Sequence, residues 1–126
     1  HRPAREFLRG ISSGRDPWYL TDGILYEFMR VATHAKVFPR PLGWHEAFGF
    51  IEPICAADNV HLLHAGDTHW PLLGEILATL THPSGNIFFD IRTVVLMREH
   101  GIRCIYTTDT DFLQFGNIEV VNPLRA

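Results

Sequence analysis

Three acidic residues, Glu27, Asp90 and Asp109, occur where an ionised side chain needs compensation. The first two fall near the start of strongly apolar helical segments, and the third directly follows an apolar strand. Carboxylates do not gather in half-buried places without an arginine or a hard cation beside them. Mg²⁺ takes one or two carboxylates, with waters and substrate phosphate oxygens as its other ligands. The pattern therefore predicts an acidic metal site, which suits the hydrolysis of phosphodiester bonds.

Each of these acids also has a purely structural explanation. Glu27 could pair with Arg30, one turn further along the same helix. Asp109 and Asp111 could cap the short helical turn that follows them, as aspartates often do. Asp90 could favour the N-terminus of its helix because of the helix dipole alone. Spacing by itself leaves both explanations open.

Other catalytic chemistries find less support in the sequence. Ser84 lacks the Gly-x-Ser-x-Gly context of a nucleophilic serine, and no phosphate-binding Gly-x-x-x-x-Gly-Lys loop occurs. His61, His64 and His69 are close together, yet they lack the His-Glu-x-x-His arrangement of a zinc site. They are predicted to be surface or strand-edge histidines.

The elements that must position the acids alternate between helix and strand. This order predicts an α/β fold, a three-layer α/β/α sandwich with a mostly parallel central sheet. In such a sheet ligands bind at the carboxyl ends of the strands, and the three acids belong to that edge. Asp22, Asp67 and Asn86 are the predicted helix caps, and the helix that contains Glu27 is predicted to be largely buried. The predicted helices cover 3–11, 22–34, 44–57, 67–80 and 87–100, and the predicted strands cover 18–20, 60–64, 102–107 and 118–121, with a helical turn at 112–115.

Length and composition set the class of protein. The chain has 126 residues, 46% hydrophobic and 20% charged, which predicts a single domain over 1–126 with a substantial core. Its net charge of −3 argues against a generic basic nucleic-acid coat. No apolar run approaches the roughly 20 residues of a membrane helix, so no membrane partner is expected. Cys55 and Cys104 form no Cys-x-x-Cys pair, which favours buried, reduced thiols in a cytoplasmic protein.

Four segments carry a more specific signal. They are Leu-Tyr-Glu-Phe-Met-Arg-Val at 25–31, Gly-Asn-Ile-Phe-Phe-Asp at 85–90, Tyr-Thr-Thr-Asp-Thr-Asp-Phe at 106–112 and Asn-Pro-Leu at 122–124. In order and spacing they resemble a PIN domain, and specifically the VapC toxins of bacterial toxin–antitoxin pairs. The Thr-Thr-Asp-x-Asp-Phe element is the most specific, and Glu-x-x-Arg-Val is moderately specific. Most members have Ala after the helix aspartate, where this chain has Ile91.

The resemblance implies a metal-dependent endoribonuclease whose quartet of acids holds Mg²⁺ or Mn²⁺. Hydrolysis would use a metal-activated water, with no protein nucleophile. The resemblance also implies an RNA substrate, a VapB-type antitoxin and a homodimer. Three of the four catalytic acids are matched, together with a frequent additional metal ligand and a hydroxyl that lines the site. The three matched acids are Glu27, Asp90 and Asp109, the additional metal ligand is Asp111, and the hydroxyl is that of Thr107 or Thr108.

The fourth acid of the family lies in a first β-strand with an Asp-x-Asn-Val-Leu-like sequence, which this chain does not contain. We therefore expect roughly 15–25 further residues before His1, enough for a strand and its connection. The predicted first helix has Arg2, Arg5 and Arg9 on one face. That face could follow an RNA backbone or be an ordinary solvated surface.

Two other functions remain open at this point. A degenerate PIN-like module could bind RNA or protein without cleaving it, and the absent first acid and Ile91 are compatible with that function. An unrelated flavodoxin-like binding domain would not need the carboxylates of Asp90 and Asp109. Convergence of the Glu27, Asp90 and Asp109 carboxylates on one cation position would favour the nuclease, and carboxylates that point apart would argue against it.

Overall fold

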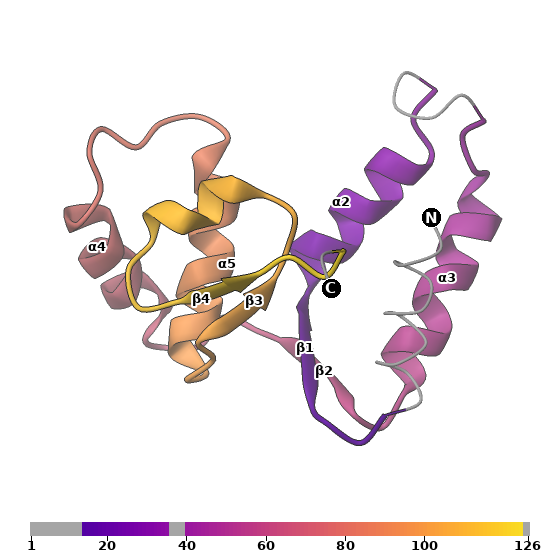
Figure 1. Ribbon diagram of the computed structural model, residues 1–126, viewed down its shortest axis with the longest axis horizontal. Coiled ribbons are helices and arrows are strands. Elements are labelled where there is room, and N and C mark those ends of the chain that lie inside the picture. The colour runs from indigo at the N-terminus through magenta and orange to yellow at the C-terminus, as the bar shows by residue number, and fades with distance from the viewer. Residues whose placement is uncertain (1–13, 36–39, 125–126) are drawn as a thin grey trace. The chain divides into compact units, whose positions relative to one another are not determined.

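The structure is a computed structural model that describes residues 14–35 and 40–124 (Figure 1). Its contacts divide the chain into two compact units, whose described parts are an N-terminal unit within 14–62 and a C-terminal unit within 63–124. The helix predicted at 3–11, with Arg2, Arg5 and Arg9, lies outside the described residues. The single-domain organisation and the extra residues before His1 stay predictions.

The N-terminal unit combines a two-stranded sheet with two helices. Its elements are β1 (Trp18–Thr21), α2 (Asp22–Ala32), α3 (Trp44–Ala56) and β2 (Val60–Leu63), and β1 pairs with β2. Thr21, not the predicted Asp22, caps α2, because its Oγ1 accepts a hydrogen bond of 3.1 Å from the Ile24 amide. The strand runs directly into the helix, so the last extended residue of the strand is also the cap.

The prediction that α2 is largely buried is wrong. Ala32 is buried, whereas Ile24, Tyr26 and Phe28 are exposed. Within its unit α2 packs mainly against α3 and β1. These neighbours cover only part of its circumference, although apolar residues occur in most directions around the helix. Apolar residues all round a helix indicate burial only where other elements surround it.

The C-terminal unit places two parallel strands beside a buried helix (Figure 1). Its elements are α4 (His69–Ala78), α5 (Ile87–Glu99), β3 (Cys104–Tyr106), the 3₁₀ helix η1 (Thr110–Gln114) and β4 (Glu119–Val121). β3 and β4 pair with Ile105 opposite Val120, and α4 packs against α5. The core of this unit joins α4, α5 and the η1 segment through Ile76, Ile91, Val94, Val95, Phe112 and Phe115.

The ends of the helices in this unit follow local chemistry. The N-cap of α4 is Thr68 rather than the predicted Asp67, so Pro71 falls in the first turn, where its missing N–H costs no helical hydrogen bond. Asn86 occupies the N-cap of α5, but its side chain makes no capping hydrogen bond. Gly101 follows α5 with a φ of 68°, the left-handed conformation typical of the residue after a helix.

The mixed α/β class predicted from the alternation of helices and strands is confirmed, with β3 and β4 in parallel. This arrangement is consistent with the α/β/α fold of PIN domains. Over residues 14–35 and 40–124, no helix is both long and apolar enough to cross a membrane. Cys104 is half-buried, whereas Cys55 is exposed on α3, so the prediction of a buried thiol is wrong for Cys55.

Candidate active site

Two elements of the C-terminal unit bring three carboxylates together. Asp90 lies in the first turn of α5, and Asp109 and Asp111 lie at the start of η1. One oxygen from each of these side chains lies within 4.8 Å of the others. The convergence follows from packing, because the neighbouring side chains of Ile91 and Phe112 are buried in the same core.

The loop between β3 and η1 is fixed by its own polar groups. The Thr107 amide donates to the carbonyl of Val121 over 2.9 Å, and the Thr107 hydroxyl accepts from the Asp109 amide over 3.0 Å. Asp109 Oδ1 then accepts from the Asp111 amide over 2.8 Å, so Asp109 also caps η1, as its structural explanation proposed. This bond uses one oxygen of the carboxylate and leaves Oδ2 for a second ligand. Thr108, in the middle of this loop, is exposed.

The cluster is electrostatically unfavourable without a counter-charge. Partial burial raises the pKa of the Asp90 carboxyl group, and the charges of Asp109 and Asp111 raise that pKa further. Two like unit charges about 4 Å apart repel each other by about 1 kcal/mol in bulk water and about 4 kcal/mol near a protein surface. A bound cation would remove this repulsion. A donor set made only of carboxylate oxygens fits a hard divalent ion such as Mg²⁺.

Glu27 belongs to the N-terminal unit and lies on the exposed helix α2. Its side chain is 60% exposed, so the expectation of a half-buried carboxylate is wrong. Arg30 Nε donates to Glu27 Oε2 over 3.2 Å, and Arg30 Nη2 pairs with Oε1. The hydrogen bond from Arg30 holds the pKa of Glu27 below its usual value. The structural explanation of Glu27 is thus observed, and its part in a metal site stays a prediction.

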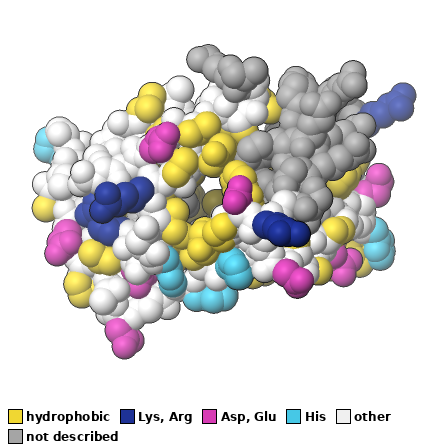
Figure 2. Space-filling model, turned by 60° about the horizontal axis from the view of Figure 1, so that its bottom comes forward, with side chains coloured by type: hydrophobic (Ala, Val, Ile, Leu, Met, Phe, Trp, Pro, Cys, Tyr) yellow, Lys and Arg dark blue, Asp and Glu magenta, His cyan; other side chains and the backbone are white. Residues whose placement is uncertain are grey.

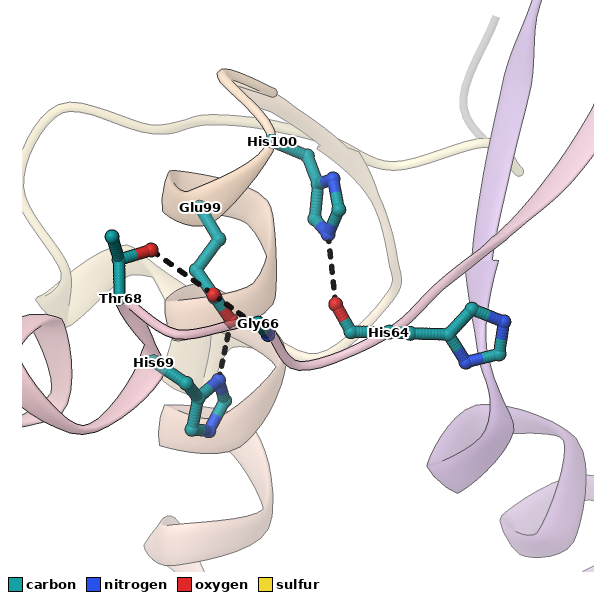
Figure 3. A network of polar contacts seen from close by, with 6 residues as sticks. All are labelled: His64, Gly66, Thr68, His69, Glu99 and His100. Carbon is teal, nitrogen blue, oxygen red and sulfur yellow. Dashed lines mark hydrogen bonds and ion pairs between the residues drawn. The ribbon is translucent and has the colours of Figure 1, made fainter.

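A second carboxylate of α5, Glu99, has a different environment (Figure 3). Its side chain is only 3% exposed. Its oxygens accept hydrogen bonds from the Gly66 amide (3.0 Å), the Thr68 hydroxyl (3.1 Å) and His69 Nδ1 (2.6 Å). Burial alone raises the pKa of Glu99, but these hydrogen bonds together hold it below its usual value. The ionised Glu99 therefore joins the end of α5 to the start of α4.

This network was not predicted from the sequence. His69 is only 8% exposed, so its interpretation as a surface or strand-edge histidine is wrong. His100 Nε2 donates to the His64 carbonyl over 3.0 Å and ties the end of α5 to the same loop (Figure 3). The feature of the sequence that could have indicated this network is the position of Glu99 in the last turn of a predicted helix. The helix dipole disfavours a carboxylate there unless nearby donors compensate for it.

Known proteins similar to this chain are VapC ribonucleases. Ribonuclease VapC33 of Mycobacterium tuberculosis is 30% identical over 131 residues, covering 99% of the chain and 86% of the relative. Ribonuclease VapC48 of the same species is 29% identical over 126 residues, covering 100% and 86%. VapC ribonuclease Mb2897 of Mycobacterium bovis is 26% identical over 124 residues, covering 98% and 83%. No protein-family model matches the chain.

These relatives are aligned over nearly the whole chain, and their likeness confirms the resemblance found in the four sequence segments. The fold and the acidic cluster agree with a protein of the PIN-domain class. The chain belongs to the VapC family of ribonucleases.

Proposed function

We propose that the protein is an endoribonuclease, the toxin of a toxin–antitoxin pair, which hydrolyses phosphodiester bonds of RNA with Mg²⁺ or Mn²⁺. The observation that carries the proposal is the convergence of Asp90, Asp109 and Asp111 within 4.8 Å, in a chain whose relatives are named ribonucleases. In this proposal the three acids hold the cation, and Glu27 supplies a further carboxylate.

The residues of the C-terminal unit have separate tasks in this mechanism. Asp90 lies at the start of a helix whose following residues are buried. The backbone that carries its carboxylate is therefore held in place. Thr107 orients the backbone of Asp109, and Asp109 in turn orients Asp111. The exposed hydroxyl of Thr108 is available to donate to a substrate oxygen. When bound, the cation would polarise the phosphoryl group and lower the pKa of an attacking water.

RNA cleavage by the full-length protein, separated from any antitoxin, tests this function. We expect cleavage of a structured RNA in Mg²⁺, which EDTA abolishes. Asp90→Asn should lower the rate by on the order of 100-fold or more, because a lost ligand removes several kcal/mol of charge stabilisation. Persistent cleavage by Asp90→Asn would refute the assigned site.

The matched control for this variant is Asp67→Asn. Asp67 is exposed, and its neighbours Gly66 and Thr68 bind Glu99 at the far end of α5 from Asp90. The control makes the same chemical change away from the acidic cluster, so cleavage should stay at the wild-type rate. If the wild type itself cleaves no RNA with metal present, the alternative function is favoured, a PIN-like module that binds RNA or protein without cutting it.

Family membership also supports an antitoxin of the VapB type as a partner. An arginine from such a partner would neutralise the acidic cluster, because guanidinium groups pair with carboxylates through two hydrogen bonds.

We further propose a homodimer, contacts from Arg2, Arg5 and Arg9 to the RNA backbone, and action in the cytoplasm, where the RNA substrate is found. Light scattering tests the dimer, and a reduced salt dependence of RNA binding in an alanine variant of the three arginines tests the contacts.

A further inference from the structure

An exposed aromatic residue directly precedes Asp90, one of the acids of the cluster, in the chain. Apolar side chains reach the surface in several places on the face drawn in Figure 2. Phe89 is 74% exposed and directly precedes Asp90 in the first turn of α5. Phe88 before it is 43% exposed, whereas Ile91 and the residues 93–97 that follow are buried. Phe89 is therefore no part of the core, although the same helix supplies most of that core.

The position of Phe89 on α5 places it one residue before Asp90, the acid at which the phosphate would bind. Long side chains on a helix lean toward its N-terminus, and α5 begins only two residues before Phe89. The side chains of Phe89 and Asp90 thus both lean toward the N-terminus of α5, about 100° apart around its axis. Their Cα atoms are about 3.8 Å apart, as for any two consecutive residues. A nucleotide whose phosphate lies at the carboxylates therefore has its base within reach of the Phe89 ring.

We propose that Phe89 stacks on an unpaired nucleobase next to the scissile phosphate. The proposal rests on the proposed ribonuclease function and adds to it a side chain that binds the substrate. Bases inside an A-form duplex are stacked on one another and present no face to a side chain, whereas splayed bases stack on aromatic rings. Every base has such a face, so this contact favours an unpaired base without selecting its identity.

A nucleobase accounts for this surface better than a second protein does. A stable protein interface covers about 800 Å² on each partner, which is several times the exposed area of Phe88 and Phe89 together. One ring suffices to cover one base. Phe89 is also the residue next to Asp90, at whose carboxylate the phosphate of the same nucleotide must bind.

Steady-state cleavage of a single-stranded RNA oligonucleotide in Mg²⁺ tests this contact. Phe89→Ala should raise KM by about 5- to 150-fold with little change in kcat, the range that base–aromatic stacking supplies. Phe89→Trp keeps an aromatic face and should retain the wild-type KM. The matched control is Trp70→Ala, because Trp70 is also 74% exposed. Its neighbour His69 binds Glu99, which lies ten residues or about 15 Å along α5 from Phe89.

A second substrate distinguishes stacking from a general loss of structure. The same oligonucleotide with an abasic nucleotide beside the cleaved bond should raise the KM of the wild type by a similar factor. It should not raise the KM of Phe89→Ala further, since the partner of the ring is already missing. Equal abasic penalties in both proteins would overturn the proposal, as would a wild-type KM in Phe89→Ala.

The controls separate this inference from the function on which it rests. If the wild type cleaves the oligonucleotide but Phe89→Ala is unaffected, only the stacking contact is refuted. If the wild type cleaves no RNA, the ribonuclease function fails and the stacking contact fails with it. Light scattering on Phe89→Ala should give the wild-type mass, and a changed oligomeric state with an unchanged KM would assign Phe89 to a subunit interface instead.

Discussion

The two ends of helix α5 place carboxylates in opposite situations. At its start, Asp90 meets Asp109 and Asp111, and partial burial together with their negative charges raises its pKa. At its end, the Glu99 side chain is only 3% exposed but accepts hydrogen bonds from three groups, and its pKa is lowered. The difference shows that burial alone does not mark a functional acid. A carboxylate is a candidate ligand where its neighbours are other acids, and a structural group where the chain supplies the donors.

The largest effect that tests this comparison is on stability. Glu99→Gln keeps the shape of the side chain but removes the charge and places an amide NH₂ among hydrogen-bond donors. We expect the Tm to fall by roughly 5–10 °C, because the NH₂ group cannot accept a hydrogen bond from the donors at Gly66, Thr68 and His69. Asp90→Asn removes a repulsive charge and should not lower the Tm. Thermal unfolding of both variants in metal-free buffer measures the two effects.

Activity gives the complementary result for the same pair of variants. Glu99→Gln should still cleave RNA at temperatures where it is folded, because Glu99 makes no contact with the acidic cluster and lies in the last turn of α5. A Tm equal to that of the wild type in Glu99→Gln, or a lowered Tm in Asp90→Asn, would contradict the division into structural and functional acids.

The second test extends the comparison to Glu27, which has one strong donor, Arg30, and is exposed. If Glu27 is a site carboxylate, Glu27→Gln should lower the cleavage rate by about 10- to 100-fold, the range found when supporting groups of a metal site are lost. Arg30→Gln breaks the same ion pair and leaves the carboxylate, so its rate should fall much less. Equal losses in the two variants would show that the ion pair, rather than the carboxylate, is what matters.

The sequence predicted the acidic cluster better than it predicted the environment of Glu27. Asp90 and Asp111 each precede an apolar residue that is buried, Ile91 or Phe112, and this local pattern brought them together. The exposure of α2 could not be predicted, because it depends on how many elements surround the helix. The role of Glu99 could not be predicted for a related reason, since its partners at 66–69 lie about thirty residues away in the chain.

The third test uses the cation as a ligand that stabilises the folded state. A cation that binds only the folded protein stabilises it by about 1.4 kcal/mol at ten times its Kd, which raises the Tm by several degrees. We expect this rise with Mg²⁺ in the wild type and in Glu99→Gln, but not in Asp90→Asn. Differential scanning fluorimetry with and without Mg²⁺ measures it. A rise in Asp90→Asn as large as that of the wild type would place the cation elsewhere.

The smallest expected effect is a difference in pH dependence between the two ends of α5. The pKa of Glu99 is lowered from its ordinary value of 4.5, so its contribution to stability is present above that pH and is lost as the pH falls through the lowered pKa. The pKa of Asp90 is raised from its ordinary value of 3.8. Between 3.8 and the raised pKa of Asp90 in the folded state, the folded protein binds more protons than the unfolded chain. The contribution of Asp90 to stability therefore falls as the pH rises through this range.

Melting curves in metal-free buffer between about pH 3 and pH 7 resolve these opposite signs. The Tm difference between the wild type and Glu99→Gln should shrink in acid, because protonation removes the charge that the variant already lacks. The Tm difference between Asp90→Asn and the wild type should instead grow as the pH rises above 3.8. Taken as variant minus wild type, the first difference should become more negative and the second more positive as the pH rises. If both shift with the same sign, the surroundings of the two carboxylates are not opposite in kind. Asp90 would then have donors of its own, and the need for a cation at the start of α5 would disappear.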